Sequence, residues 1–180
     1  MIAFICLLVV SIGTDTTATY AKSKPVTKDF LLNKNKIYTY ERVDGIVSIE
    51  YMETDKEGYR FWGYVDVPQY YIGLGKEERQ NKKGYYFYSS ATPNGRPDAV
   101  TNKPVKGKKY TNKYGSSYVV TSTNATVKTK YKTFKNCMVI KYGNYYEYYA
   151  PHYGLVKSTT KAKKGFTTDW ELISVKNKKK

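Results

Sequence analysis

The sequence is poor in the residue types from which catalytic and metal sites are usually built. It has one histidine, His152, and two cysteines, Cys6 and Cys137, among 180 residues. A zinc site or a histidine-based triad needs more partners than these. His152 also lies in a turn sequence, between Pro151 and Gly154, which favours an exposed residue over a catalyst. We therefore expect no metal, no cofactor and no enzymatic activity.

Long apolar runs are also scarce. The run from Ile2 to Ile12 is shorter than the roughly 20 residues that span a bilayer, but it has the length of a signal-peptide core. Thr19 and Ala21 place small side chains where signal peptidase requires them. We predict that residues 1–21 are a signal peptide, cleaved after Ala21. No basic residue precedes the run, so a buried N-terminal strand is the alternative.

Cleavage would leave Cys137 as the only cysteine, which excludes an intramolecular disulfide. Cys137 opens the apolar segment Cys137–Ile140, so we expect a buried and unreactive thiol. A lone cysteine and a high content of lysine, asparagine and tyrosine fit exported proteins of Gram-positive bacteria. We predict a secreted protein with no membrane span after cleavage, which is either released or retained at the cell wall by charge alone.

Acidic residues are about half as frequent as basic ones. The chain has 31 Lys and Arg against 15 Asp and Glu, a formal net charge of +16. Removal of residues 1–21 takes away Asp15 and no basic residue, so the mature charge rises by one. A basic balance of this size indicates a polyanionic partner or a highly charged, soluble surface.

Close pairs of carboxylates occur at Glu53/Asp55 and Glu77/Glu78. A glycosidase needs two acids that face each other across a cleft and have separated pKa values. Because these pairs lie among lysines near predicted turns, we interpret them as surface ion pairs.

No stretch keeps a helical apolar period over three turns. Instead, short segments of β-branched and aromatic residues alternate with turn residues. We predict an all-β fold: an antiparallel twisted sheet forming a sandwich or half-barrel, with about ten short strands and little helix. The single domain is expected over residues 36–176, after a polar lead-in at 22–35 and before a basic tail at 177–180.

The best-specified strands are Phe134–Tyr142 and Tyr145–Ala150, joined by the hairpin turn Gly143-Asn144. The lead-in contains Phe30-Leu31-Leu32, which we expect to dock as a short edge segment. Residues 75–82 are expected to form a short helix or an exposed loop, and residues 91–107 the longest loop. Further strands are predicted at Ile37–Val43, Ile46–Thr54, Tyr59–Val67, Tyr70–Ile72, Tyr85–Ser90, Lys108–Tyr110, Ser117–Ser122, Ala125–Lys130, Leu155–Ser158 and Thr168–Val175.

The C-terminal half carries a recognisable pattern. Its elements are Thr133–Ile140 (TFKNCMVI), Tyr148–Pro151 (YYAP), Gly154–Lys157 (GLVK) and Trp170–Leu172 (WEL). This pattern resembles small exported β-domains of Firmicutes, largely of unknown function, over about Pro104–Lys180. Lys132 stands where that family usually has glycine, and His152-Tyr153 where it has Gly-Val. The resemblance implies an antiparallel twisted sheet that faces the cell wall, and it implies no catalytic residues.

Lysines are the main candidates for binding. Lys128, Lys130 and Lys132 alternate with other residues, so a strand would place them on one face. Phosphates pair with lysine, and sugars or bases stack on tyrosine. The candidate ligand-binding residues are Lys128, Lys130, Lys132, Lys157, Lys161, Lys163, Lys164, Tyr145, Tyr146 and Tyr148. The alternative is a basic surface that only keeps the protein soluble.

These observations predict a secreted, non-enzymatic protein that associates with an anionic cell-envelope polymer, such as teichoic acid, or with an anionic membrane surface. Nucleic acid is a less favoured partner, because export removes the protein from the cytoplasm and no DNA- or RNA-binding motif is present. The alternative function is a carrier that encloses an apolar ligand inside a curled sheet. Its inward-facing residues would be Phe61, Trp62, Phe87 and Phe134.

Overall fold

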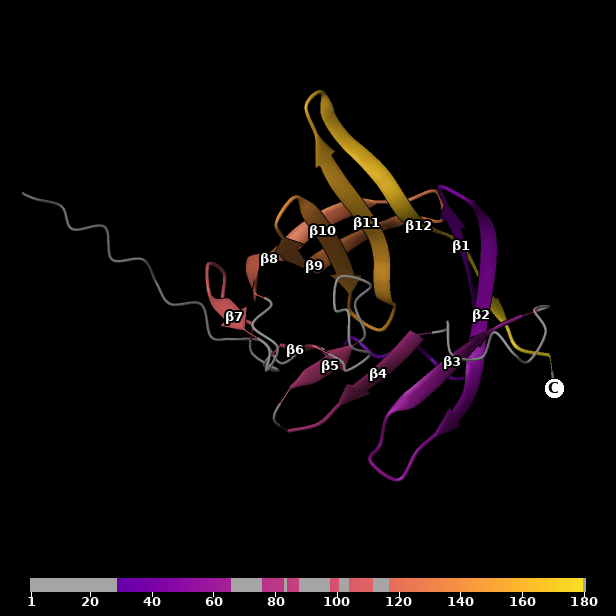
Figure 1. Cartoon of the computed structure of the whole chain (residues 1–180). Helices are drawn as coiled ribbons and strands as arrows, with labels where there is room; N and C mark the ends of the chain where they lie inside the picture. Colours follow the sequence, from indigo (N-terminus) through magenta and orange to yellow (C-terminus); the bar gives the residue numbers. More distant parts are fainter. Residues whose placement is uncertain are drawn as a thin grey trace, which may run out of the picture.

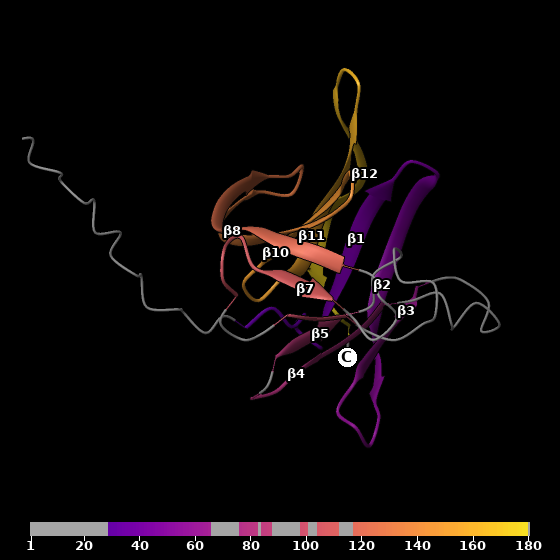
Figure 2. The ribbon, with the colours of Figure 1, turned by 60° about the vertical axis from the view of Figure 1, so that its left-hand side comes forward.

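The computed structural model describes residues 29–65, 76–82, 84–87, 98–100, 104–111 and 117–179. Within them the chain forms one sheet of twelve strands, in the order β6-β5-β4-β3-β2-β1-β12-β11-β10-β9-β8-β7. The sheet curls strongly and leaves β6 and β7 as its two edges (Figures 1 and 2). The predicted all-β class is therefore confirmed, in its half-barrel form. The predicted signal peptide, Tyr70–Ile72 and most of the loop at 91–107 lie outside the described residues. Within that loop, residues 98–100 pair with β5 as a strand, which the sequence prediction missed.

All pairings between neighbouring strands are antiparallel, and β1 joins the two halves of the sheet by pairing with β12. Gly143, with a φ of 53°, forms the predicted hairpin turn between β9 and β10. The strands are β1 (Lys36–Arg42), β2 (Gly45–Thr54), β3 (Arg60–Tyr64), β4 (Lys76–Gln80), β5 (Tyr85–Phe87), β6 (Asp98–Val100), β7 (Lys109–Thr111), β8 (Ser117–Lys128), β9 (Thr133–Tyr142), β10 (Tyr145–Ala150), β11 (Gly154–Ala162) and β12 (Gly165–Asn177).

The last two strands are longer than predicted. Residues 159–167, left between two predicted strands, extend β11 and β12 and close a hairpin at Lys163-Lys164. Two threonine pairs, Thr159-Thr160 and Thr167-Thr168, supply the β-branched side chains that favour extended backbone. Gly165, with a φ of 111°, takes the conformation that closes the turn.

Residues 29–33, called the strap below, cross the hollow of the sheet without joining it as a strand. Phe30 and Leu32 are 1% and 0% exposed. The strap therefore docks as predicted, but inside the molecule and not along a sheet edge. Its C-terminal end is fixed where the Asn33 backbone N–H donates to the Tyr38 hydroxyl at 2.8 Å.

Side chains of β4 hold the strap inside the molecule. Glu78 and Gln80 point to the same side of β4 because side chains alternate along a strand. The Glu78 carboxylate accepts the Leu32 N–H at 2.8 Å, and the Gln80 side-chain oxygen accepts the Phe30 N–H at 3.0 Å. The prediction of a helix or exposed loop at 75–82 is wrong, because these polar side chains bind backbone in the interior.

The strap also connects two hydrophobic clusters. Leu32 belongs to the first, which includes Tyr38, Tyr40, Trp62, Val127, Phe134, Cys137 and Leu172. Phe30 belongs to the second, which includes Tyr85, Phe87, Met138, Ile140 and Tyr149. In the second cluster the Phe87 and Tyr149 rings lie 4.9 Å apart, so β5 faces β10 across the hollow. Cys137 is fully buried, as predicted.

The outer half of the β8–β9 hairpin folds back over the sheet. At its end, the Tyr131 N–H donates to the Leu172 carbonyl of β12 at 3.3 Å. Val127 and Phe134 join the first cluster from this hairpin. The two strands predicted at Ser117–Ser122 and Ala125–Lys130 are one strand, β8, with irregular pairing to β9.

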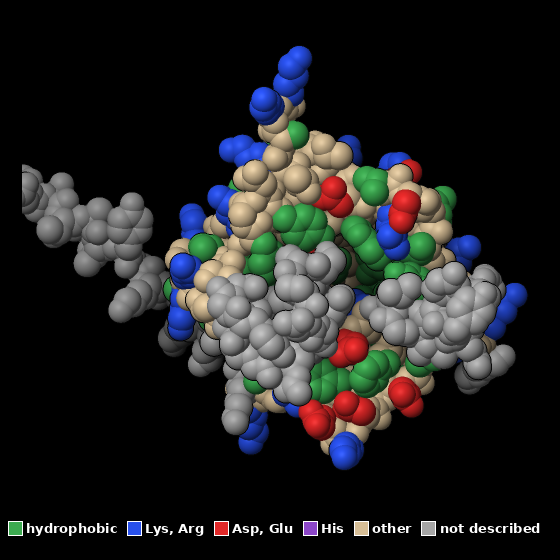
Figure 3. All heavy atoms as spheres, viewed as in Figure 1, with side chains coloured by type: hydrophobic (Ala, Val, Ile, Leu, Met, Phe, Trp, Pro, Cys, Tyr) green, Lys and Arg blue, Asp and Glu red, His purple; other side chains and the backbone are tan. Residues whose placement is uncertain are grey.

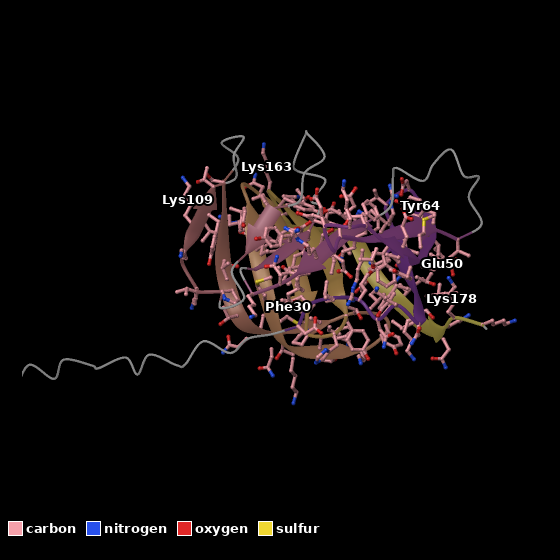
Figure 4. All side chains as sticks on the ribbon, turned by 90° about the horizontal axis from the view of Figure 1, so that it is seen from below. Phe30, Glu50, Tyr64, Lys109, Lys163 and Lys178 are labelled. Atoms are coloured by element: carbon pink, nitrogen blue, oxygen red, sulfur yellow. The ribbon has the colours of Figure 1, made fainter. Side chains whose placement is uncertain are left out.

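The C-terminal tail is partly fixed. Lys178, predicted to lie in a solvated basic tail, forms an ion pair with Glu50 at 3.1 Å (Figure 4). Its backbone N–H also donates to the Asn35 carbonyl at 2.9 Å. The sheet therefore holds the chain as far as Lys178.

We predict that Leu32→Ala and Phe30→Ala each lower the free energy of unfolding, by about 2–5 and 3–5 kcal/mol respectively, because each leaves a cavity in a cluster. Urea denaturation followed by circular dichroism measures the change. Val105→Ala is the control, since Val105 is 51% exposed. Equal stability of the Leu32 variant and the control would contradict the role of the strap.

Candidate anion-binding surface

The three lysines predicted on one strand face do not lie on one strand. Strand β8 ends at Lys128, and Thr129–Lys132 form the turn to β9. The Thr129 N–H donates to the Lys132 carbonyl at 3.0 Å, and the Lys132 N–H donates to the Thr129 hydroxyl at 3.2 Å. Lys130 and Lys132 therefore sit on a turn, where the alternation expected of a strand does not apply.

Protein groups already engage both turn lysines. Lys130 forms an ion pair with Glu41 of β1, and this hydrogen bond raises the pKa of Lys130. The Lys132 ammonium donates to the Tyr153 hydroxyl at 2.7 Å. It also lies 3.9, 5.0 and 5.4 Å from the ring centroids of Tyr153, Phe134 and Tyr131. Such cation–π contacts help to hold the β8–β9 turn in place.

Lys157 is also neutralised. It lies on β11 opposite Glu171 of β12, and its ammonium reaches the Glu171 carboxylate at 3.1 Å. Both side chains are largely covered, with 22% and 12% of their surface exposed. Lys157 is thus a poor candidate for an external anion.

Lys161, Lys163 and Lys164 are different. All three are exposed at the end of the β11–β12 hairpin, and no ion-pair partner for them occurs among the described residues. Pairing of β11 with β10 ends at Thr160, and pairing of β12 with β1 ends at Trp170. The end of the hairpin therefore stands beyond both neighbouring strands. Figure 3 shows a group of basic side chains at this projecting end.

Of the three tyrosines predicted to bind a ligand, one lies near the hairpin end and two pack elsewhere. Tyr146 packs edge-on against Phe166 near the hairpin end, with ring centroids 5.4 Å apart. The Lys141 ammonium lies 5.6 Å from the Tyr146 ring. Tyr148 is half-buried beside Thr159, and Tyr145 packs against the second cluster. Only Tyr146 of the three is part of the projecting basic end.

Sequence reasoning missed Phe166 and Lys141. Phe166 is 58% exposed and comes directly after the turn Lys163-Lys164-Gly165. Reading those residues as a turn between two threonine-rich strands would have placed Phe166 opposite Lys161, where the structure has it. Lys141 gave no such signal, because its contact depends on the register of β9 with β10.

Acidic residues lie at the end of β2 that is far from the basic hairpin. Glu53 and Glu57 are exposed there, around the β2–β3 turn, and Figure 3 shows acidic side chains at this end. Glu77 of β4 lies near Asp55, and its partial burial, followed by the Asp55 charge, raises its pKa. This end of the molecule therefore exposes carboxylates, together with Lys56 of the same turn.

Polar groups also meet in the hollow of the sheet. Glu78 is fully buried, which contradicts its interpretation as part of a surface ion pair. It accepts hydrogen bonds from the Leu32 N–H and, at 3.1 Å, from the Tyr85 hydroxyl. Glu147 is 2% exposed and accepts a hydrogen bond from the Tyr149 hydroxyl at 2.9 Å. Both carboxylates thus bind groups of the protein itself.

Lys76 completes this interior group. Its buried ammonium lies 3.6 Å from the Glu78 carboxylate and makes no hydrogen bond within the described structure. Burial lowers the pKa of Lys76, while Glu78 and Glu147 oppose that change. We assign the group a structural role, because its hydrogen bonds hold the strap and the rings around it.

The remaining candidates for chemistry lie apart. The His152 side chain is 74% exposed, as predicted, and its Nδ1 lies 3.7 Å from the Asp29 carboxylate. Within the described part of the chain, no cluster of histidine, cysteine and carboxylate side chains could hold a metal ion. We also find there no helix with the length and hydropathy needed to cross a bilayer.

These features define the class of protein: an all-β half-barrel with a filled hollow and a projecting basic hairpin. No protein family and no curated protein matches the chain. A predicted exported protein with a YmcC-like fold from Bacteroides fragilis is similar, with 16% identity and a TM-score of 0.47 over 84% of this chain and 100% of that chain. A predicted lipoprotein from Parabacteroides distasonis has 12% identity and a TM-score of 0.34, with the same two coverages. Likenesses this weak carry no argument about function.

The buried tyrosines predict a steep loss of stability in alkali. Burial raises the pKa of Tyr38 to about 12 and the pKa values of Tyr40, Tyr85 and Tyr149 well above the usual 10. The folded state therefore keeps protons that the unfolded state loses, so its stability is full below pH 10 and falls above it. Between pH 10 and its own pKa in the folded state, each buried phenol contributes a loss of about 1.4 kcal/mol per pH unit.

Tyrosine absorbance at 295 nm, titrated in parallel with circular dichroism, measures this effect. We expect one group of tyrosines to ionise with the fold intact and a second group to ionise only as the fold is lost. The control is the same titration in concentrated urea, where a single transition is expected. Complete ionisation near pH 10 with an unchanged fold would contradict the burial of these phenols.

Proposed function

We propose that this is an exported, non-enzymatic protein that binds an anionic surface of the cell envelope through the basic hairpin end. The hairpin end is defined as residues 161–166 with Tyr146. The observation that carries the proposal is the exposure of Lys161, Lys163 and Lys164 beyond the neighbouring strands, with no ion pair to a described residue. Unpaired ammonium groups in this position can approach phosphate groups without first breaking an internal contact.

The ends of the molecule differ in their exposed charges. The β2–β3 turn lies at the opposite end of β2 from the β1–β2 turn and the basic hairpin, and it exposes Glu53 and Glu57 beside Lys56. The hairpin end exposes three lysines that have no ion pair to a described residue. An anionic surface would therefore attract the hairpin end more strongly.

Export rests on residues 1–21, whose apolar core and small residues before the predicted cleavage site have the form of a signal peptide. Outside a Gram-positive membrane, teichoic acids and anionic lipid headgroups both present phosphate. Nucleic acid stays a less favoured partner.

The carrier alternative has less support. Trp62, Phe87 and Phe134, three of the four residues predicted to enclose an apolar ligand, are buried among protein side chains. Phe61, the fourth, is half-buried and points to the other face of β3 from Trp62, because side chains alternate along a strand. Phe30 and Leu32 of the strap pack within the same two clusters. A ligand between these rings would have to displace the strap.

We predict that replacing Lys161, Lys163 and Lys164 together by glutamine weakens binding to isolated cell envelopes by about fivefold for each lysine, because each contributes about 1 kcal/mol near an anionic surface. Co-sedimentation of the protein with envelope fragments across a sodium chloride series measures this. Binding by the unaltered protein should fade as salt rises.

The matched control replaces Lys106, Lys108 and Lys109 by glutamine. These lysines are exposed near edge strand β7, and the replacement changes the net charge equally (Figure 4 labels Lys109 and Lys163). The control should bind like the unaltered protein. Equal weakening by both triple replacements would show a diffuse charge effect and overturn the assignment of the hairpin end.

A further inference from the structure

Two neighbouring hairpins expose apolar side chains at the same end of the sheet. Phe166 is 58% exposed on the β11–β12 hairpin. On the β1–β2 hairpin, Val43 and Ile46 are 75% and 67% exposed and flank Asp44-Gly45. Turns usually carry polar residues at such positions. Figures 1 and 2 both show these hairpins projecting at the same end of the molecule.

Folding does not explain these exposed side chains. The apolar side chains of the two core clusters come from the strap and the sheet, and neither cluster includes Val43, Ile46 or Phe166. A free polyanion such as teichoic acid offers phosphate to the lysines but no apolar phase for these side chains. A lipid bilayer offers both, since its headgroups carry phosphate and its acyl chains lie directly beneath.

The hairpin end places basic and apolar side chains side by side, as contact with headgroups and acyl chains would require. Lys161 and Phe166 are paired residues on β11 and β12, with Ala162, Gly165 and the two turn lysines beyond them. Tyr146 packs beneath Phe166 and has the amphipathic ring that is common at membrane interfaces. Lysine stems are long enough to hold their ammonium groups among headgroups while a neighbouring ring enters the apolar layer.

The acidic residues near this edge are already paired. Asp44 accepts a hydrogen bond from Arg42 at 2.6 Å, and the Arg42 guanidinium also stacks 4.5 Å from the Trp170 ring. Asp169 accepts a hydrogen bond from the Thr160 hydroxyl at 2.8 Å. Arg42 offsets the charge of Asp44, whereas Asp169 keeps its negative charge, so the three unpaired lysines leave the edge with a net positive charge.

We propose that the two hairpin ends form a docking edge for an anionic phospholipid bilayer. Phe166, with Val43 and Ile46, enters the interface, and Lys161, Lys163 and Lys164 contact lipid phosphates. This inference rests on the proposed function and names its partner. Membrane binding of this kind needs two signals, one apolar and one electrostatic, and the edge supplies both.

The test compares vesicles with a lipid-free polymer. The probes are phosphatidylcholine vesicles with and without phosphatidylglycerol, and purified wall teichoic acid. We expect binding to the vesicles that contain phosphatidylglycerol. Phe166→Ala should weaken that binding about tenfold and weaken binding to teichoic acid much less, while Val105→Ala should change neither. Val105 is the matched control, because it is similarly exposed but lies outside the two hairpins.

A fluorescent reporter gives a second measurement. The emission of a Phe166→Trp variant should shift to shorter wavelength when anionic vesicles are added, while that of a Val105→Trp variant should not shift. The parent protein is the baseline, because it contains Trp62 and Trp170. Circular dichroism checks that each variant keeps its fold.

The outcomes separate the two proposals. Binding to teichoic acid but not to anionic vesicles would overturn the bilayer and leave the basic surface in place. Vesicle binding that is unchanged by both Phe166→Ala and the double replacement Val43→Ser with Ile46→Ser would also overturn it. If the Lys161, Lys163 and Lys164 triple replacement binds both probes as tightly as the unaltered protein, the proposed function itself fails.

Discussion

The structure depends on how the strap is held inside the sheet. The Glu78 carboxylate lies in the hollow and accepts the Leu32 N–H and the Tyr85 hydroxyl. A buried carboxylate without such donors would be costly, and so would the unpaired backbone N–H of Leu32. Each satisfies the other, and the contact sets Leu32 in one cluster and Phe30 in the next. The strap and the two clusters therefore occupy the interior of the curled sheet, which is not closed.

Because the strap occupies the hollow of the sheet, we look for the binding site at the outer ends of the strands. Several lysines that looked available in the sequence have partners within the protein: Lys130 pairs with Glu41, Lys157 pairs with Glu171, and Lys132 contacts three aromatic rings. Lys128 of the predicted set is exposed at the end of β8, and Lys106 and Lys109 are exposed near β7. The β11–β12 hairpin differs from these places because its three lysines project beyond the neighbouring strands, beside an exposed aromatic ring.

Local signals were enough to predict the all-β class, the Gly143-Asn144 turn and the burial of Cys137, because turn chemistry and apolar patterning act over a few residues. They failed where a distant contact decides. Strand β4 is highly polar and forms because Glu78 and Gln80 bind backbone 46 and 50 residues away. The prediction that Lys128, Lys130 and Lys132 share one strand face failed for a related reason. It assumed that the strand continues past Lys128, where the structure has a turn. Phe166 was missed because the hairpin around it was not recognised.

Amide hydrogen exchange on the protein bound to envelope fragments tests the central claim most directly, because it locates the contact without altering a residue. The account predicts slower exchange at residues 159–168 and around the β1–β2 turn, with β7 and the β2–β3 turn unchanged. Protection spread evenly over the basic surface, or centred on the Lys128–Lys132 turn, would contradict the claim that the projecting hairpin makes the contact.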